Sequence, residues 1–543
     1  MSRSTVLTNR QIFRAAGVAL LGFLTSGVLG VVRTAIINGT FGAGPALDAF
    51  YAAQRIPELI FVLVAGGALG SSFIPLFARF LRNEDEPQAW RLASAVMTFS
   101  AILAGLLSLL VVIFAPRIVA TVLVPGKSPE VQALTVSLMQ VMMLTPFIFS
   151  ISGLLMGILQ TYGNFLLPSL AISMNSIGLI IGALVLARLI PSMTGTVAQV
   201  GESNVYGLAW GAVLSAVLHL LVQLPGLMRL QTRSAKIRFL SDWSVPGLRE
   251  VLSLMLPRVL GLGVAQINFI VNANFASRMT TGSLTVMTTA WTLMFTVLGI
   301  IGQSIGTAVF PTLAALAADG NMVEYKERLA RALRGVLFLA LPATAGLIVL
   351  GGPVIAFLYQ REAWTAEDTA GTAWALAFFA VSIAGHASLE VLSRAFYALA
   401  DSRTPVLVGV LSLVSNIVLS IVFIQYIGDP ASLARGPFAG LALANSLTTL
   451  AEALVLWVLL RWRIGYLNDH QVWDGLVRTG AAALAMTAVI VLFRWLAEER
   501  LSSALVGVGG AALGAVVFFG SSILLKMDET NAVLGAVIRR FKR

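Results

Sequence analysis

Long apolar segments separated by short polar connections fill the chain from residue 12 to residue 525. Each segment reaches the length of about 20 apolar residues that a membrane-spanning helix needs, and the runs are continuous rather than alternating, which favours helices over a barrel. The pattern predicts an all-α polytopic membrane protein with about fourteen transmembrane helices. The approximate limits of the segments are 12–38, 47–80, 92–122, 131–160, 165–190, 205–231, 247–277, 283–316, 329–359, 373–399, 404–427, 435–461, 474–496 and 502–525.

The composition supports the membrane class. The 543 residues are 58% hydrophobic and 11% charged, whereas a soluble chain would be about one quarter charged. The net charge of +11 arises from residues in short connections, so it indicates membrane topology and not binding of nucleic acid. Cysteine is absent, which excludes disulfides and thiol chemistry. The N-terminal tail leads into the first segment without an A-x-A-like cleavage site, so we expect no removed signal peptide.

Most Lys and Arg residues lie in the N-terminal tail, in alternate loops and in the C-terminal tail. Because cytoplasmic loops carry an excess of basic residues, this distribution places both termini in the cytoplasm. An even number of spans predicts the same arrangement.

Two pairs of segments indicate an internal repeat. GALGSSFIPLFARF (67–80) resembles QSIGTAVFPTLAAL (303–316), and LMGILQTYGNFLLPSL (155–170) resembles LSRAFYALADSRTPVL (392–407), at offsets of 236 and 237 residues. The offset corresponds to six spans, as in transporters built from parallel repeats. We therefore predict two pseudo-symmetric six-helix lobes, 1–231 and 232–465, followed by two extra helices and a basic tail in 466–543.

Ionisable residues gather in the first two predicted spans, at Arg33, Asp48, Arg55 and Glu58. Such groups are costly at membrane depth and by default face a protein interior or an aqueous cavity. Arg55 and Glu58 share a helix face, and Pro57 between them frees a backbone carbonyl and favours a kink. The alternatives are an arginine that reaches the membrane surface from a helix end, for Arg33, and an internal salt bridge, for Arg55 and Glu58.

The seventh predicted span carries Arg258 near its start and then four amide side chains. These are Gln266, Asn268, Asn272 and Asn274. Amides hold membrane helices together, but four on one span exceed what packing usually requires. Packing and a substrate pathway both remain open for this set.

His386, Glu390 and Arg394 follow one another at intervals of four residues in the tenth predicted span, so they form one stripe. We interpret the stripe as a possible coupling network that responds to protons or ligand. An intrahelical salt bridge is the alternative.

Motifs for nucleotide or metal chemistry are absent from the sequence. Gly126–Lys127–Ser128 lacks the first glycine of a P-loop, and there is no HExxH, no Cys/His set and no GxSxG. We therefore expect no cofactor, and an ion gradient, the membrane potential or the substrate gradient as the energy source; the coupling ion is unknown.

Several stretches resemble the MurJ (MviN) family of lipid II flippases, in the superfamily that includes the MATE drug exporters. They are TSGVLGVVRTAI, FGAGPALDAF, RIPEL, GGALGSSFIPLF, LMGILQTYGNFLLPSLA, AQINFIVNANFAS, IGTAVFPTLA and FYALADSRTPV, which cover nearly the whole chain in order. In the resemblance, Arg33 is the arginine after the LG pair, Asp48 the acid of DAF, and Arg55 the basic residue before the proline.

The resemblance implies transfer of lipid II, a polyprenyl-pyrophosphate-linked peptidoglycan precursor, from the inner to the outer leaflet of the bacterial cytoplasmic membrane. It implies alternating access of two lobes, a cationic cavity for the pyrophosphate, and a groove on the last two helices for the lipid tail. A flippase makes no covalent bond, so we expect no enzyme activity. We expect a monomer that meets membrane lipids, with proteins of cell-wall synthesis as possible partners and no nucleic acid.

The chain departs from the family where other cavity charges are usual. It has Gly27 in the first span, Phe61, Val62 and Gly66 in the second, and Trp291 and Thr292 in the eighth. Our hypothesis is that Arg258 substitutes, with Arg33, Asp48, Arg55, Glu58, Gln266 and Asn272 completing the substrate site. Two alternatives stand: an exporter of another lipid-linked oligosaccharide or a cationic amphiphile, and a membrane enzyme that uses the acidic cluster Glu362, Glu367 and Asp368.

Overall fold

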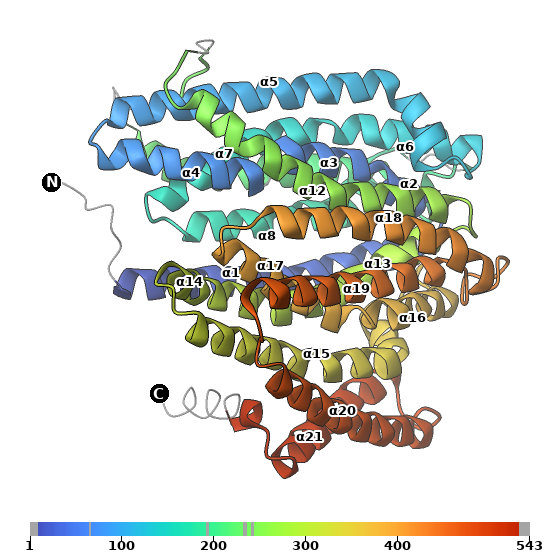
Figure 1. Cartoon of the computed structure of the whole chain (residues 1–543). Coiled ribbons are helices and arrows are strands. Elements are labelled where there is room, and N and C mark those ends of the chain that lie inside the picture. The colour runs from blue at the N-terminus through green and yellow to red at the C-terminus, as the bar shows by residue number, and fades with distance from the viewer. Residues whose placement is uncertain (1–8, 65–66, 192–194, 232–235, 241–243, 532–543) are drawn as a thin grey trace. The chain divides into compact units, whose positions relative to one another are not determined.

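The computed structural model describes residues 9–64, 67–191, 195–231, 236–240 and 244–531. Within these ranges, the side chains of 9–24, 67–71, 256–258 and 260–261 are not described. Contact clustering divides the chain into two compact units, Met1–Thr285 (unit 1) and Val286–Arg543 (unit 2). Each unit is a layered set of helices (Figure 1).

Unit 1 is helical apart from one two-stranded hairpin. Its elements are α1 (Asn9–Phe41), α2 (Pro45–Ala53), α3 (Arg55–Val64), α4 (Gly67–Arg82), α5 (Glu86–Ile118), η1 (Val119–Leu123), α6 (Pro129–Met142), α7 (Leu144–Thr161), α8 (Leu166–Ile181), η2 (Gly182–Leu186), α9 (Ala187–Leu189), β1 (Gln199–Val200), β2 (Ser203–Asn204), α10 (Tyr206–Leu221), α11 (Leu224–Leu230), α12 (Leu248–Ser277) and the first turn of α13 (Ser283–Leu298).

Unit 2 contains the rest of α13 and the helices that follow it. These are η3 (Gly299–Gln303), α14 (Ser304–Ala318), α15 (Met322–Tyr359), α16 (Ala366–Ala380), α17 (Ile383–Ala398), α18 (Arg403–Tyr426), α19 (Phe438–Ile464), α20 (Asp469–Ala497) and α21 (Ser503–Leu524). The helix α15 packs against both α20 and α21, where Phe338, Met486 and Phe518 share one apolar cluster.

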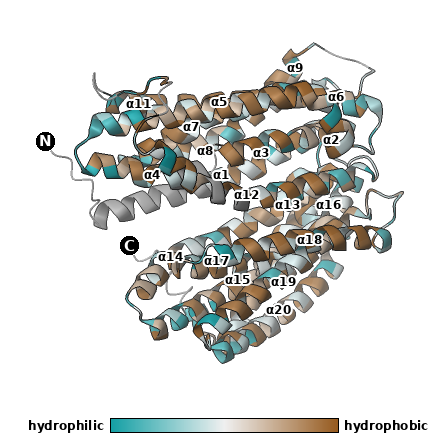
Figure 2. Cartoon of the chain, turned by 45° about the horizontal axis from the view of Figure 1, so that its top comes forward, coloured by the Kyte–Doolittle hydropathy of each residue, from teal (hydrophilic) through white to brown (hydrophobic). Residues whose placement is uncertain are grey.

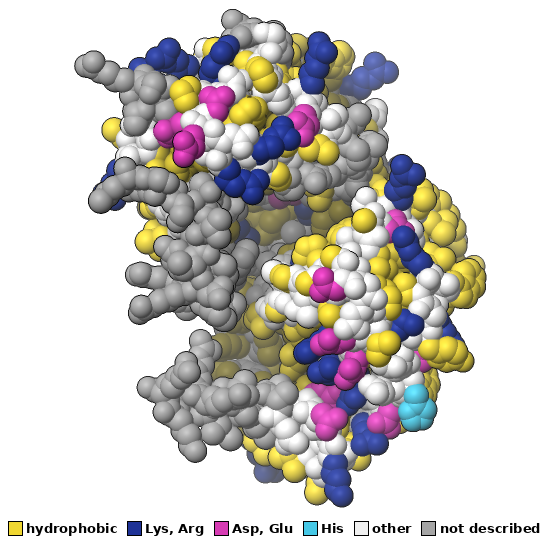
Figure 3. Space-filling model, turned by 60° about the vertical axis from the view of Figure 1, so that its left-hand side comes forward, with side chains coloured by type: hydrophobic (Ala, Val, Ile, Leu, Met, Phe, Trp, Pro, Cys, Tyr) yellow, Lys and Arg dark blue, Asp and Glu magenta, His cyan; other side chains and the backbone are white. Residues whose placement is uncertain are grey.

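The fold is that of an all-α polytopic membrane protein. In the described part of the chain, ten helices are long and apolar enough to cross a membrane, or eleven if the bent pair α16 and α17 forms one span. The count of about fourteen spans stays a prediction. Hydrophobic residues dominate the helices along their length (Figure 2), as burial in lipid requires. Acidic and basic side chains are mixed on one face of the molecule (Figure 3), and exposed pairs such as Arg328 with Glu324 lie near helix ends.

The second apolar segment, predicted over 47–80, is broken into α2, α3 and α4. Pro57 explains the first break, because it has no N–H to offer the carbonyl of Ala53, where α2 ends. The chain continues in helical geometry, with Glu58 N donating to the carbonyl of Gln54 at 3.0 Å. The kink that the sequence predicts at Pro57 is therefore present.

The internal repeat is visible in details of the backbone as well as in the order of elements. Asp85 caps α5 by accepting from Gln88 N, and 236 residues later Asn321 caps α15 by accepting from Glu324 N. The residue before each cap, Glu84 in one and Gly320 in the other, has positive φ. The connections between α7 and α8 and between α17 and α18 also turn through positive φ, at Gly163 and Ala400. These correspondences support two copies of one helical plan.

Small residues allow α8 and α10 of unit 1 to approach closely. A Cβ on Gly178 would lie 2.5 Å from the backbone of Ser215, and one on Gly182 would lie 2.7 Å from Gly211. Spacings of four residues, Gly178–Gly182 and Gly207–Gly211, place two small-xxx-small faces against each other, as in membrane helix pairs. In unit 2, Gly302 and Gly306 likewise give α17 room, as the sequence predicts for close helix approach.

Candidate functional site

The kinked helix α3 presents an arginine and a carboxylate to α12 within unit 1. Arg55 Nη1 lies 3.4 Å from Glu58 Oε2, with side-chain exposures of 11% and 41%. The Arg55 guanidinium also lies over the Phe269 ring of α12, 5.2 Å from its centroid. A cation over an aromatic face is attracted to it, so Phe269 holds Arg55 in place while Glu58 remains open to its surroundings.

Arg33 lies in the interior of α1, because the helix continues two turns beyond it to Phe41. It is partly buried. Tyr51 of α2 is close enough to both Arg33 and Arg55 for each guanidinium to act electrostatically on its hydroxyl. The structure therefore brings the two predicted arginines to one region, and Tyr51, which the sequence reasoning missed, lies between them.

The amide side chains of α12 leave acceptor atoms unused. Gln266 Oε1, Asn268 Oδ1 and Asn272 Oδ1 are buried oxygens without a hydrogen-bond partner among the described residues. Unpaired buried acceptors carry a desolvation cost, which suggests that a donor outside the protein completes them. Asn274 differs, because its Nδ2 donates to the Val122 carbonyl at 2.8 Å and so packs the helix.

Two groups of predicted residues lie outside the described part. The side chain of Arg258 is one, although its backbone belongs to α12. The glycines Gly66, Gly67 and Gly70 are the other.

Asp48 is held by a set of protein groups that we call the Asp48 cluster: Asp48, Lys127, Gly282 and Thr285. Lys127 Nζ lies 3.0 Å from Asp48 Oδ2, and the two side chains are 7% and 1% exposed. Gly282 N donates to Oδ2 at 2.8 Å, while Thr285 donates to Oδ1 from its N at 3.0 Å and its Oγ1 at 2.8 Å. The contact with Lys127 is an ion pair without hydrogen-bond geometry. Three donors and one cation thus occupy both carboxylate oxygens.

The Asp48 cluster joins three distant parts of unit 1: the start of α2, the loop before α6 and the turn into α13. The sequence reasoning treated Gly126–Lys127–Ser128 only as an imperfect P-loop and missed this role. A signal was available, since Lys127 stands alone between two apolar spans and between Pro125 and Pro129.

In unit 2, the stripe on α17 divides into two parts. Arg394 Nη1 lies 2.7 Å from Glu390 Oε2, and Arg394 Nη2 donates to Thr307 Oγ1 of α14 at 3.3 Å. His386 instead faces other elements: its Nε2 is 3.5 Å from Thr449 Oγ1 of α19, and the Trp291 ring lies edge-on at 5.8 Å. The intrahelical ion pair named as an alternative is therefore present, and His386 stands beside it.

The acidic cluster after α15 has a structural use. Thr365 and Asp368 form a capping box at the start of α16, in which Asp368 Oδ2 accepts from Thr365 N at 2.9 Å. The described residues include no group of three or more His, Asp or Glu side chains able to hold a metal ion.

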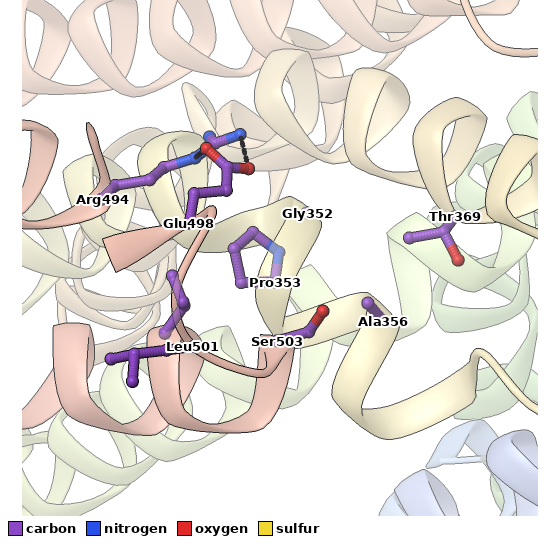
Figure 4. Close-up of a pocket in the computed structure, with 9 residues that line it drawn as sticks. Gly352, Pro353, Ala356, Thr369, Arg494, Glu498, Leu501 and Ser503 are labelled. Atoms are coloured by element: carbon purple, nitrogen blue, oxygen red, sulfur yellow. Dashed lines mark hydrogen bonds and ion pairs between the residues drawn. The ribbon is translucent and has the colours of Figure 1, made fainter. Parts of the chain in front are cut away.

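A pocket of about 180 Å³ lies where α15, α16, α20 and α21 meet. Figure 4 shows Arg494 and Glu498 paired at one side of it and Thr369 at the other. Arg494 makes two contacts with Glu498, at 3.0 and 2.9 Å, and donates to the Val349 carbonyl at 2.9 Å. Its donors are thus engaged, and the pair closes this corner of the helix bundle.

Known proteins with this sequence and fold are flippases and related exporters. The family model described as "Lipid II flippase MurJ" matches residues 37–507. A lipid II flippase MurJ of Burkholderia cenocepacia is 30% identical over 457 residues, which cover 83% of this chain and 84% of that protein. Among solved structures, a MurJ in an inward closed conformation covers 94% of this chain and 99% of its own, with a TM-score of 0.75 and 22% identity.

A more distant structure supports the superfamily. An inward-facing MATE multidrug transporter covers 84% of this chain and 99% of its own, with a TM-score of 0.66 and 18% identity, so the likeness concerns the fold alone. The match over most of the chain and the curated relative decide the family. This protein belongs to the MurJ family of lipid II flippases.

Proposed function

We propose that this protein moves lipid II from the cytoplasmic to the outer leaflet of the bacterial inner membrane. Family membership over residues 37–507 carries the proposal. Both termini face the cytoplasm, the protein acts as a monomer, and no covalent bond is made or broken.

The headgroup binds at the region of Arg33 and Arg55. A pyrophosphate is a double anion, and charge-assisted hydrogen bonds from guanidinium groups are the strong and geometrically specific way to hold it. The partly buried Arg33 and Arg55 lie near one another around Tyr51, which supports a shared anion site. Arg258 adds a third cation from α12.

The amide oxygens of α12 supply a second half of the site. Sugar hydroxyls and peptide N–H groups are donors, and the open acceptors Gln266 Oε1, Asn268 Oδ1 and Asn272 Oδ1 suit them. A cationic part for pyrophosphate next to an acceptor-rich part for sugar and peptide matches the two chemical halves of the cargo.

The Asp48 cluster acts as a latch in alternating access. It ties α2, the loop before α6 and the turn into α13 through a buried ion pair and three hydrogen bonds. In our proposal the latch is closed while the site faces the cytoplasm and opens when the headgroup is released outside. The stripe of His386, Glu390 and Arg394 couples the cycle to an ion gradient.

The lipid tail lies against the last two helices. Large apolar side chains of α20 and α21 are exposed, among them Leu484, Trp495 and Val516. An exposed apolar surface of this kind is stable against acyl chains, so the polyprenyl chain stays in lipid while the headgroup crosses.

The test is binding of lipid II to purified protein in detergent, with a cationic drug as the competing ligand class. We expect lipid II to bind, and Arg33→Ala and Arg55→Ala to weaken that binding. Arg188→Ala, a variant of an exposed arginine at α9, is the matched control and should bind as wild type. Equal binding by all three variants, or binding of the drug alone, would contradict the proposal.

A further inference from the structure

A carboxylate in the middle of a membrane-spanning helix has no part in the proposed site. Glu452 lies near the centre of α19 (Phe438–Ile464), about 20 Å from either end at 1.5 Å per residue. It is partly buried. An ionisable group at this depth is expensive, and its default interpretation is a functional one.

The surroundings of Glu452 are nearly free of charge. Its Oε1 lies over α18, 3.5 Å from where a Cβ on Gly409 would stand, and the Ser412 hydroxyl is within hydrogen-bond reach of the carboxylate. Among the described residues Glu452 forms no ion pair within 4.0 Å, in contrast to Glu390, which is paired with Arg394.

Helix α17 supplies the only titratable groups that face Glu452 from a packed neighbour in the described structure. Tyr397 is close enough to interact electrostatically with Glu452, with Glu390 and with Arg394. The ion pair of Glu390 and Arg394 is internally neutralised, and α18 contributes the uncharged Gly409 and Ser412. Glu452 thus has no cation to compensate a negative charge.

We propose that Glu452 is a proton-binding site in the membrane, which carries a proton in one step of the transport cycle and releases it in another. A lone carboxylate with one hydroxyl donor is poorly compensated when ionised, so binding of a positive charge neutralises it. A proton needs no further ligands, whereas a hard metal cation takes about six oxygens. The single hydroxyl of Ser412 therefore fits a proton and not a metal ion.

This inference deepens the proposed function by assigning the coupling ion, and it rests on transport only for its consequence. The binding itself can be tested without cargo. Dicyclohexylcarbodiimide, an apolar reagent, modifies protonated carboxyl groups within membranes, and mass spectrometry locates the modified residue. The experiment uses the full chain in proteoliposomes from pH 5 to pH 9, with and without sodium ions.

We expect modification of Glu452 that rises as the pH falls, is unchanged by sodium and is absent in Glu452→Gln. Ser412→Ala removes the donor that stabilises the charged form, so modification at a given pH should increase. Glu498→Gln, which changes the carboxylate paired with Arg494, is the matched control and should leave modification of Glu452 unchanged.

Absence of modification at every pH, or modification independent of pH, would overturn the proposal. Suppression by sodium at constant pH would also overturn it, because the ligand would then be a metal cation. If Glu452 is modified as expected but the liposomes do not flip lipid II, the proposed function fails and the proton site stands. If flipping occurs and a pH gradient accelerates wild type but not Glu452→Gln, both stand.

Discussion

Removal of Asp48 and removal of Lys127 should have unequal consequences, although the two residues form one ion pair. Asp48→Asn leaves Lys127, which is 7% exposed, without a counter-charge. Lys127→Met leaves the Asp48 carboxylate with three donors, Gly282 N, Thr285 N and Thr285 Oγ1. The first variant strands a buried cation, whereas the second removes one of four stabilising contacts from an anion.

The magnitudes follow from this difference. Breaking a buried pair so that one charge is left uncompensated costs about 3–5 kcal/mol. A hydrogen-bonded carboxylate that loses its cation but keeps three donors should lose about 1–2 kcal/mol. Because 1.4 kcal/mol is tenfold in an equilibrium constant, Asp48→Asn should raise the open-to-closed ratio of the Asp48 cluster by a factor of more than about 100. Lys127→Met should raise it by about tenfold, and the double variant should fall between the two.

The chain has no cysteine, which allows a direct assay of opening. Ser283 is fully buried beside the Asp48 cluster, so a single cysteine at this position reports when the turn into α13 becomes accessible. The measurement is the rate of modification by a membrane-impermeant maleimide in each background. A cysteine at the exposed Ser502 is the control and should react at one rate in all of them.

Equal rates for Asp48→Asn and Lys127→Met would refute the reasoning, because they would mean that the buried lysine needs no partner. A double variant that opens more than Asp48→Asn alone would refute it as well. In that case the cluster would be held by the hydrogen bonds and not by compensation of charge.

Three further predictions concern other parts of the molecule. Arg55→Ala removes one or two charge-assisted hydrogen bonds, each worth about 1.5–3 kcal/mol, and should weaken binding of lipid II by at least about tenfold in a titration with purified protein; unchanged affinity would exclude Arg55 from the site. Asp401, in the turn before α18, loses some hydration, but hydrogen bonds from the backbone and side chain of Thr404 and the ion pair with Arg463 hold its pKa below the ordinary value of 3.8. Its contribution to stability is therefore present above pH 3.8 and lost as the pH falls through the lower folded pKa, so Asp401→Asn should lower the thermal midpoint at pH 7, with a difference from wild type that vanishes in acid; a difference independent of pH would contradict this. Gly178→Ala forces a Cβ to within 2.5 Å of the Ser215 backbone and should cost about 1–3 kcal/mol in denaturant unfolding, while Gly335→Ala, which meets nothing within 4 Å, should not destabilise; equal effects would remove the close-packing argument.

Features that depend on neighbouring residues in one helix were accessible from the sequence. The break at Pro57 follows from a missing N–H, and the pairs Arg55–Glu58 and Glu390–Arg394 follow from helical spacing. The repeat offset also anticipated matching caps at Asp85 and Asn321. Each needs only local geometry.

Features that join distant segments were not accessible in the same way. The partner of Asp48 lies in a loop 79 residues away, and no periodicity links Lys127 or Thr285 to α2. Phe269 beneath Arg55 is equally remote. Glu452 was overlooked for the opposite reason: it has no charged neighbour one helical turn away, so it formed no pattern, although this isolation is what makes it informative.

Boundaries of helices show where lipid patterning alone falls short. Arg33 was placed at the end of a span because the apolar run weakens at 38, yet α1 continues to Phe41 and leaves Arg33 inside the helix. Polar residues near a helix end continue it when the protein buries them, as it does Asn38.

The central claim is that a cationic region at Arg33 and Arg55 carries the lipid II headgroup across the membrane. Its most direct test is transfer of labelled lipid II between leaflets of proteoliposomes that contain the purified protein, compared with the Arg33→Ala/Arg55→Ala double variant and with Arg188→Ala. We predict transfer by wild type and by Arg188→Ala, and its loss in the double variant. Transfer by the double variant at the wild-type rate would contradict the claim.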